Sequence, residues 1–277
     1  MSSETRQSGP AEPLRADEIE AFVEALLQAR AQRRPAQLPQ GFAQPCSPAQ
    51  AREIAAAHMA RVLEQHGGRV AGAKLGATNA EAMARLGLAR PFTGPVFSAA
   101  MIAGPARLPR SDFLACVIEA EVAVRFGAPI GGSGVPPLTA ALVAAIDALF
   151  PVIEIADCRL AGFPALPPVA IAADLGFAGA LVTGVPVADW RRHDLAALRA
   201  TLSVNGEQVR EGAGAAVMGN PLDALAQYVA ELGESGRAVA AGEIVSTGTW
   251  TAPWFGQAGE RIVADFGPLG RVELELV

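Results

Sequence analysis

One stretch of the chain reads Ala115-Cys-Val-Ile-Glu-Ala-Glu-Val-Ala-Val-Arg-Phe126, an apolar run that is interrupted by two glutamates one residue apart. The run has the length and composition of a buried β-strand, in which residues i and i+2 project from the same face. Glu119 and Glu121 would therefore lie side by side, and the opposite face would be filled by Cys116, Ile118, Ala120, Val122 and Val124. Two carboxylates this close repel each other unless a cation or a shared proton offsets their charge, so the pair points to a divalent metal.

A third carboxylate favours this interpretation over the alternative of two strand glutamates that face solvent. The stretch Pro151-Val-Ile-Glu154-Ile-Ala-Asp157-Cys-Arg159 is a second apolar strand, interrupted by one acid and ending in Asp and Arg. Carboxylates that converge from two strands form an oxygen-rich site suited to Mg²⁺ or Mn²⁺. By contrast, Glu273 and Glu275 alternate cleanly with apolar residues near the chain end, which is typical of a half-exposed strand.

Other residue types carry weaker signals. Lys74 lies in a Gly/Ala-rich strand end, where it could bind a carboxylate or shift its pKa for proton transfer; a strand lysine that snorkels to solvent is the alternative. No histidine or cysteine has metal-ligand spacing, which disfavours zinc. We interpret His58, His66 and His193 as surface or packing residues.

Composition excludes several classes of protein. The 277 residues are 51% hydrophobic and carry a formal net charge of −6, with arginines dispersed along the chain, so no nucleic-acid surface is expected. The N-terminus lacks the apolar segment of a secretion signal, and no apolar run approaches the length of a membrane span. The three cysteines form no CxxC motif. We therefore expect a cytoplasmic protein with no membrane partner.

The order of predicted elements indicates an α+β fold in two parts. Residues 1–90 form a helical N-terminal lobe, with residues 1–14 disordered, and residues 91–277 form a mixed-β metal-binding domain. Periodicity and capping signals predict helices over residues 17–34, 47–67, 79–86, 139–149 and 220–232. Strands are predicted over residues 70–75, 115–126, 150–156, 178–183, 198–204, 207–210, 243–247, 261–266 and 270–276.

A set of motifs in a fixed order resembles a known family. The motifs are Gly72-Ala-Lys-Leu-Gly-Ala-Thr78, Ile118-Glu-Ala-Glu-Val-Ala123, Ile153-Glu-Ile-Ala-Asp-Cys-Arg159, Gly219-Asn-Pro-Leu-Asp-Ala-Leu225, Ala241-Gly-Glu-Ile-Val-Ser-Thr-Gly-Thr249 and Ala264-Asp-Phe-Gly-Pro-Leu-Gly-Arg-Val272. Together they resemble the 2-oxopent-4-enoate (2-hydroxypenta-2,4-dienoate) hydratase and 4-oxalocrotonate decarboxylase group of the fumarylacetoacetate hydrolase superfamily. The resemblance extends from about residue 16 to the end of the chain.

The resemblance implies a mixed β-roll core with a smaller N-terminal lobe, Mg²⁺ or Mn²⁺ as cofactor, and a homo-oligomer. Its three metal carboxylates correspond to Glu119, Glu121 and Glu154, and its active-site lysine corresponds to Lys74. The implied substrate is a small 2-oxo or 2-hydroxydienoic acid from aromatic meta-cleavage catabolism. On this basis we expect catalytic roles for Lys74, Asp157 and Arg159, and substrate contacts for Lys74, Thr93, Asp174, Leu175 and Thr247.

The implied reaction is the addition of water through a metal-stabilised enolate, as in the hydratases. Decarboxylation of a 2-oxo acid uses the same enolate and is the first alternative. A non-catalytic partner subunit, bound to a related family member, is the second alternative. The chain departs from the hydratase pattern at Thr93, at Cys116-Val117 and at Leu175-Gly176-Phe177, where polar groups of the family are replaced. A C–C hydrolase is less favoured because no histidine lies in a matching motif.

Overall fold

The computed structural model describes residues 1–277 except 1–12, 40–41, 43–46 and 133–139. Disorder was expected over residues 1–14, most of which lie outside the described part. Within it, the Leu14 carbonyl accepts a hydrogen bond of 2.8 Å from the side-chain amide of Gln50. None of the helices in the described part is long and apolar enough to cross a lipid bilayer.

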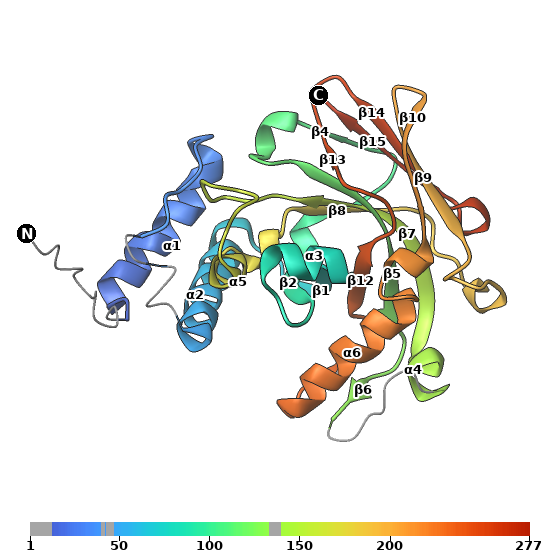
Figure 1. The fold of residues 1–277 in the computed structure, drawn as a ribbon, viewed down its shortest axis with the longest axis horizontal. Helices are drawn as coiled ribbons and strands as arrows, with labels where there is room; N and C mark the ends of the chain where they lie inside the picture. The colour runs from blue at the N-terminus through green and yellow to red at the C-terminus, as the bar shows by residue number, and fades with distance from the viewer. Residues whose placement is uncertain (1–12, 40–41, 43–46, 133–139) are drawn as a thin grey trace, which may run out of the picture.

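Two sheets form the body of the molecule, with a cluster of helices at one end (Figure 1). The large, eight-stranded sheet has the order β2-β1-β12-β5-β7-β8-β3, with β13 paired to β5. Its strands are β1 (Val70–Gly76), β2 (Phe92–Phe97), β3 (Met101–Ala103), β5 (Val117–Phe126), β7 (Ile146–Ala156), β8 (Ala180–Thr183), β12 (Ile244–Thr249) and β13 (Trp254–Phe255). Its pairing is mixed, because β1 is parallel to β12 and β3 is parallel to β8 while the other pairs are antiparallel.

The second sheet has five strands in the order β10-β9-β14-β15-β4. They are β4 (Ala106–Leu108), β9 (Arg199–Val204), β10 (Glu207–Ala213), β14 (Arg261–Asp265) and β15 (Arg271–Leu276). The turn between β9 and β10 places Asn205 and Gly206 at positive φ, as a two-residue Asn-Gly hairpin turn requires. The short strands β6 (Ile130–Gly131) and β11 (Ala238–Val239) form a separate pair.

The main hydrophobic core lies between the two sheets and helix α6 (Pro221–Glu234). The expected face of β5 is confirmed, because Cys116, Ile118, Ala120, Val122 and Val124 are fully buried in this core. Each large apolar side chain buried in this way contributes about 1.5–3 kcal/mol to folding. Burial of this face fixes the register of β5 and so directs Glu119 and Glu121 to the other face.

A second core joins the N-terminal helices to the large sheet. Helices α1 (Ala16–Ala31), α2 (Pro48–His66) and α5 (Pro168–Ala173) pack together, with Leu26 and Ile54 fully buried among them. Strand β1 precedes residue 90, yet it pairs with β2 and β12 inside the large sheet. The division of the chain at residue 90 stays a prediction, but the sheet takes its first strand from the part that was assigned to the N-terminal lobe.

One predicted element is wrong in part. A helix was expected over residues 139–149; the structure has the short helix α4 (Ala140–Ala145), after which β7 begins at Ile146. Ile146 pairs with Phe126 at the end of β5, so pairing with a long buried strand outweighs the local helical preference of an Ala/Leu-rich run. The remaining predicted strands and helices are confirmed within a few residues at each end, including α3 (Ala80–Leu86) with its Asn79 cap.

Candidate metal and substrate site

Three carboxylates meet on one face of the large sheet. Glu119 on β5 lies directly opposite Glu154 on β7, and Glu121 follows two residues along β5. One oxygen from each of the three side chains lies within 4.8 Å of the others, and in the described part of the chain no second such group of three acidic, histidine or cysteine residues occurs. Glu121 and Glu154 are buried and Glu119 is half-buried, so the group opens to one side.

The oxygens of this cluster suit a divalent cation. Glu121 Oε1 and Glu154 Oε2 are buried and have no hydrogen-bond partner among the described residues. Burial and the neighbouring charge of Glu154 raise the pKa of Glu119 to about 7, and they raise the pKa of Glu121 well above its ordinary value. Without a cation the pair therefore tends to hold protons, which a divalent ion would displace. Buried, partly unpaired carboxylate oxygens are the ligands that Mg²⁺ and Mn²⁺ prefer.

Strand β12 holds Glu121 in place. The Ser246 hydroxyl donates a hydrogen bond of 2.5 Å to Glu121 Oε2, and the Gly248 N–H donates one of 3.0 Å to the same oxygen. Both donors leave Oε1 free to face the cluster. Orientation of a ligand by its neighbours is a regular feature of metal sites. Sequence reasoning did not identify Ser246 or Gly248, although both lie in a quoted motif.

Lys74 projects from β1 toward the same cluster. Its Nζ lies 2.9 Å from Glu154 Oε1 and 4.9 Å from the centroid of the Phe92 ring. Burial alone would lower the pKa of Lys74, but the charges of the nearby carboxylates, led by Glu154, outweigh it and hold the pKa above its ordinary value. Lys74 is therefore a cation at neutral pH and is not a snorkelling strand lysine, since its side chain is only 4% exposed.

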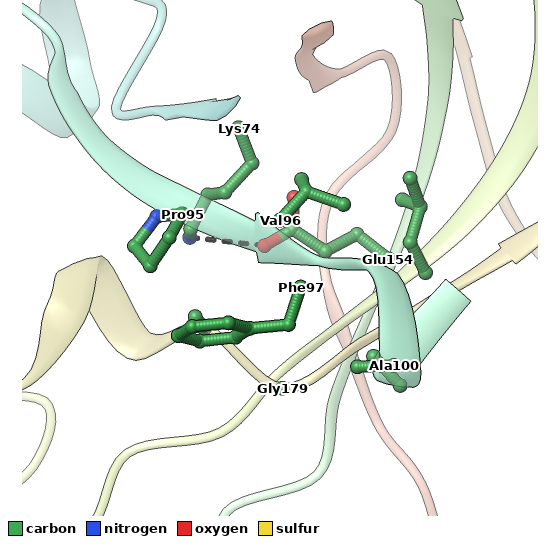
Figure 2. Close-up of a pocket in the computed structure, with 10 residues that line it drawn as sticks. Lys74, Pro95, Val96, Phe97, Ala100, Glu154 and Gly179 are labelled. Atoms are coloured by element: carbon green, nitrogen blue, oxygen red, sulfur yellow. Dashed lines mark ion pairs between the residues drawn. The ribbon is translucent and has the colours of Figure 1, made fainter. Parts of the chain in front are cut away.

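Lys74 and Glu154 line a small pocket between β2 and the segment that leads into β8 (Figure 2). Its other walls are apolar side chains and backbone from Pro95, Val96, Phe97, Ala100, Ala178, Gly179, Ala180 and Leu181. A polar pair in an otherwise apolar pocket is a common arrangement for binding a small ligand.

Three further residues were expected to contact the substrate, and the structure places each of them in a different environment. Thr93 is exposed and pairs with Leu75, so it faces the side of the sheet opposite to Lys74. Thr247 is buried, and its hydroxyl donates to the Val122 carbonyl at 2.9 Å. Leu175 is buried, and its carbonyl approaches Gly94, where a Cβ would lie only 2.4 Å from that oxygen.

Asp157, Arg159 and Asp174 form a buried network behind the pocket. Arg159 Nη1 donates to Asp174 Oδ1 at 2.5 Å, and the Arg159 N–H donates to Asp174 Oδ2 at 2.7 Å. Asp157 accepts hydrogen bonds from backbone groups and from Arg30. Catalytic roles for Asp157 and Arg159 stay predictions; these contacts favour a positioning role, because their polar atoms are engaged within the protein.

His58 and the two described cysteines are buried in the protein interior and are not part of the metal-ligand group. His58 is fully buried on α2, where Nδ1 contacts the Ala173 carbonyl at 3.1 Å, and burial lowers its pKa to about 3. It is therefore a neutral packing residue. Cys116 and Cys158 are buried free thiols, and burial raises the pKa of Cys116 to about 12. The metal-ligand group contains no histidine or cysteine.

Comparison with known proteins assigns the class. Residues 65–277 match the family described as fumarylacetoacetate (FAA) hydrolase C-terminal. The chain is 31% identical over 214 residues to a 4-oxalocrotonate decarboxylase from Pseudomonas putida, covering 77% of this chain and 80% of the relative. It is 30% identical over 182 residues to a 2-keto-4-pentenoate hydratase from Paraburkholderia xenovorans (strain LB400), covering 66% of each. The chain belongs to the fumarylacetoacetate hydrolase family.

A solved structure agrees with this assignment. The 4-oxalocrotonate decarboxylase from Pseudomonas putida G7, complexed with magnesium and adipate, superposes with a TM-score of 0.86 at 28% identity, covering 96% of this chain and all of that chain. The expected β-roll fold of this family is thereby confirmed. The expected cofactor type is also supported, since a family member of this similarity carries Mg²⁺ and the carboxylates here fit such an ion.

Proposed function

We propose that this protein is a divalent-metal-dependent lyase that adds water to a small 2-hydroxydienoate or 2-oxoalkenoate in aromatic meta-cleavage catabolism. One observation carries the proposal: three carboxylates face a lysine that stays cationic, and two of them, Glu121 and Glu154, have buried oxygens without a hydrogen-bond partner among the described residues. The names of the relatives, which include 2-keto-4-pentenoate hydratases and 4-oxalocrotonate decarboxylases, supply the reaction class.

The three glutamates would hold Mg²⁺ or Mn²⁺, and the half-buried Glu119 is the most exposed of them. When bound, the cation supplies Lewis-acid stabilisation of the oxygen of an enolate. Ser246 and Gly248 keep Glu121 in the orientation that presents Oε1 to the cluster. The apolar pocket walls exclude water from the polar pair, which strengthens their interaction with a bound acid.

Lys74 would bind the substrate carboxylate or enolate oxygen. A lysine whose pKa is raised is a poor general base at neutral pH, so its chemical use is as a fixed cation or as a proton donor at Nζ. Its contact with Glu154 places that ammonium group beside the metal ligands. The site would therefore offer the negatively charged 2-oxo acid two positive charges, the metal ion and the Lys74 ammonium group.

Decarboxylation is the second candidate function, and it is supported by the positive charge of Arg85 near the site. Among the described residues, Arg85 on α3 has no ion-pair or hydrogen-bond partner, and its positive charge acts on Glu119 to lower the pKa of that carboxyl. A decarboxylase substrate such as 4-oxalocrotonate carries a second carboxylate, which would find a cation there. A monocarboxylic acid, the substrate of a hydratase, has no second carboxylate that Arg85 could bind.

The test is turnover with Mg²⁺ or Mn²⁺. Loss of the ultraviolet absorbance of 2-hydroxypenta-2,4-dienoate would support the hydratase, whereas CO₂ release from 4-oxalocrotonate would select the decarboxylase. Turnover of neither by a protein that binds Mg²⁺ would favour the non-catalytic partner subunit. Glu273→Gln, a half-buried glutamate on strand β15 of the second sheet, is the matched control for any change at the three site glutamates.

A homo-oligomer, association with a related subunit and a cytoplasmic location are part of the same proposal. They follow from the resemblance and from composition, and size-exclusion chromatography with light scattering measures the first of them directly.

A further inference from the structure

The contacts of Asp157 connect the site to the N-terminal helix. Asp157 is fully buried, three residues after Glu154 at the end of β7. Its Oδ1 accepts backbone N–H bonds of 2.7, 2.8 and 3.3 Å from residues 114–116, just before β5. Its Oδ2 accepts a bond of 2.9 Å from Nε of Arg30 on α1. One carboxylate thus joins α1 to the two strands that carry all three site glutamates.

Arg30 also reaches the wall of the pocket. Its Nη2 donates to the Ala178 carbonyl at 3.2 Å, and Arg159 donates to the same carbonyl. Ala178 and Gly179 line the pocket beside Glu154. This wall lies tightly against β7, because a Cβ at Gly179 would come within 2.0 Å of the Ile155 carbonyl. Small shifts of the Ala178 carbonyl would therefore move the pocket lining.

Attachment of α1 to the body does not itself need Arg30. The helix is held by apolar side chains, of which Phe22, Val23 and Leu26 are buried in the second core. The Arg30 side chain is 34% exposed and its partner Asp157 is fully buried. A buried carboxylate requires a compensating charge, and among the described residues Arg30 is the only cation in an ion pair with Asp157.

We propose that Arg30 is a positioning residue of the substrate site, acting through Asp157 and the Ala178 carbonyl. In this assignment the N-terminal helix takes part in substrate binding and is not only a cover for the core. The inference rests on the proposed function for the identity of the ligand, a small 2-oxo acid. It also gives Asp157 a positioning role in place of the catalytic role expected from the sequence.

The experiment compares Arg30→Gln with Arg61→Gln. Arg61 on α2 forms an ion pair of 2.9 Å with Glu24 on α1, and its side chain is 37% exposed. It therefore matches Arg30 in exposure, but its ion-pair partner Glu24 does not line the pocket. Calorimetric titration of the Mg²⁺-loaded protein with 2-oxopentanoate is expected to show binding about tenfold weaker in R30Q and unchanged in R61Q. Affinity for Mg²⁺ alone should stay within about threefold in both.

Asp157→Asn gives an independent measurement. If Asp157 is a positioning residue, D157N should have a raised KM and weaker 2-oxopentanoate binding. If Asp157 is catalytic, D157N should instead have a lowered kcat and unchanged binding. If R30Q does not fold, D157N and R30K carry the test, and R30K should weaken binding less because a lysine keeps the charge but not the second donor.

Besides a loss of kcat alone in D157N, two outcomes for R30Q overturn the inference. One is 2-oxopentanoate affinity in R30Q equal to that in R61Q. The other is a parallel loss of Mg²⁺ affinity, ligand affinity and melting temperature in R30Q, which would mean general destabilisation. Wild-type protein that binds neither Mg²⁺ nor a 2-oxo acid would instead refute the proposed function, so the two failures are distinguishable.

Discussion

Removal of the Ser246 hydroxyl should weaken metal binding more than its small volume suggests. Ser246 Oγ donates a 2.5 Å hydrogen bond to Glu121 Oε2, and both residues are fully buried. Ser246→Ala leaves that oxygen with the Gly248 N–H as its one remaining donor among the residues that the structure describes. The lost donor favours the protonated carboxyl, so the pKa of Glu121 rises further and less carboxylate is present to bind a cation.

The size of the effect follows from the bond that is lost. A hydrogen bond to a charged group contributes about 1.5–3 kcal/mol. Since about 1.4 kcal/mol corresponds to a factor of ten, S246A should bind Mg²⁺ about 10–100-fold more weakly than the wild type. Isothermal titration calorimetry at pH 7.5 measures this directly, and circular dichroism checks that the fold is retained.

Thr247→Val is the matched control. Thr247 is the next residue in β12, is equally buried and donates to the Val122 carbonyl, not to a carboxylate. Its Mg²⁺ affinity should stay within about threefold of the wild type. The reasoning is refuted if S246A binds Mg²⁺ within twofold of the wild type, or if T247V loses as much affinity as S246A.

Three further predictions follow from the site. Mg²⁺ affinity should fall about tenfold or more between pH 8 and pH 6, because the pKa of Glu119 is raised to about 7 and its protonated form, which dominates below that pH, does not bind the ion. Affinity that is flat over this range contradicts the assignment. Arg85→Gln should weaken the binding of adipate to the Mg²⁺-loaded protein several-fold and leave the affinity for 2-oxopentanoate unchanged. Arg90→Gln, which removes an ion-paired arginine, is the control. Equal effects of Arg85→Gln on both ligands would contradict a contact with a second carboxylate. Gly94→Ala should lower stability by about 1–3 kcal/mol in chemical denaturation, because its Cβ would lie 2.4 Å from the Leu175 carbonyl; an unchanged unfolding midpoint would show that the backbone can move aside.

Strand periodicity predicted the central part of the site. Alternation along β5 requires Glu119 and Glu121 to share a face, whatever the rest of the chain does. The meeting of Glu119 with Glu154 depends on the pairing of β5 with β7, which periodicity alone does not specify. The resemblance to a family placed the three glutamates in one metal site and Lys74 beside it, and the pairing of β5 with β7 is what brings Glu154 there.

Contacts between segments that are far apart in the chain could not be predicted from local sequence patterns. Residues 146–149 were assigned to a helix because their composition suits one, but pairing with β5 makes them a strand. Asp157 resembles a site acid in sequence, yet its partners are Arg30 on α1 and backbone groups before β5. Ser246 was missed for the same reason, since a serine in a strand shows no role until its partner Glu121 is known.

The central claim is that Glu119, Glu121 and Glu154 hold one divalent metal. Calorimetric titration with Mg²⁺ should give one site per chain in the wild type and no binding in the folded double variant E119Q/E154Q, with E273Q unchanged. Wild-type affinity in that double variant would contradict the account.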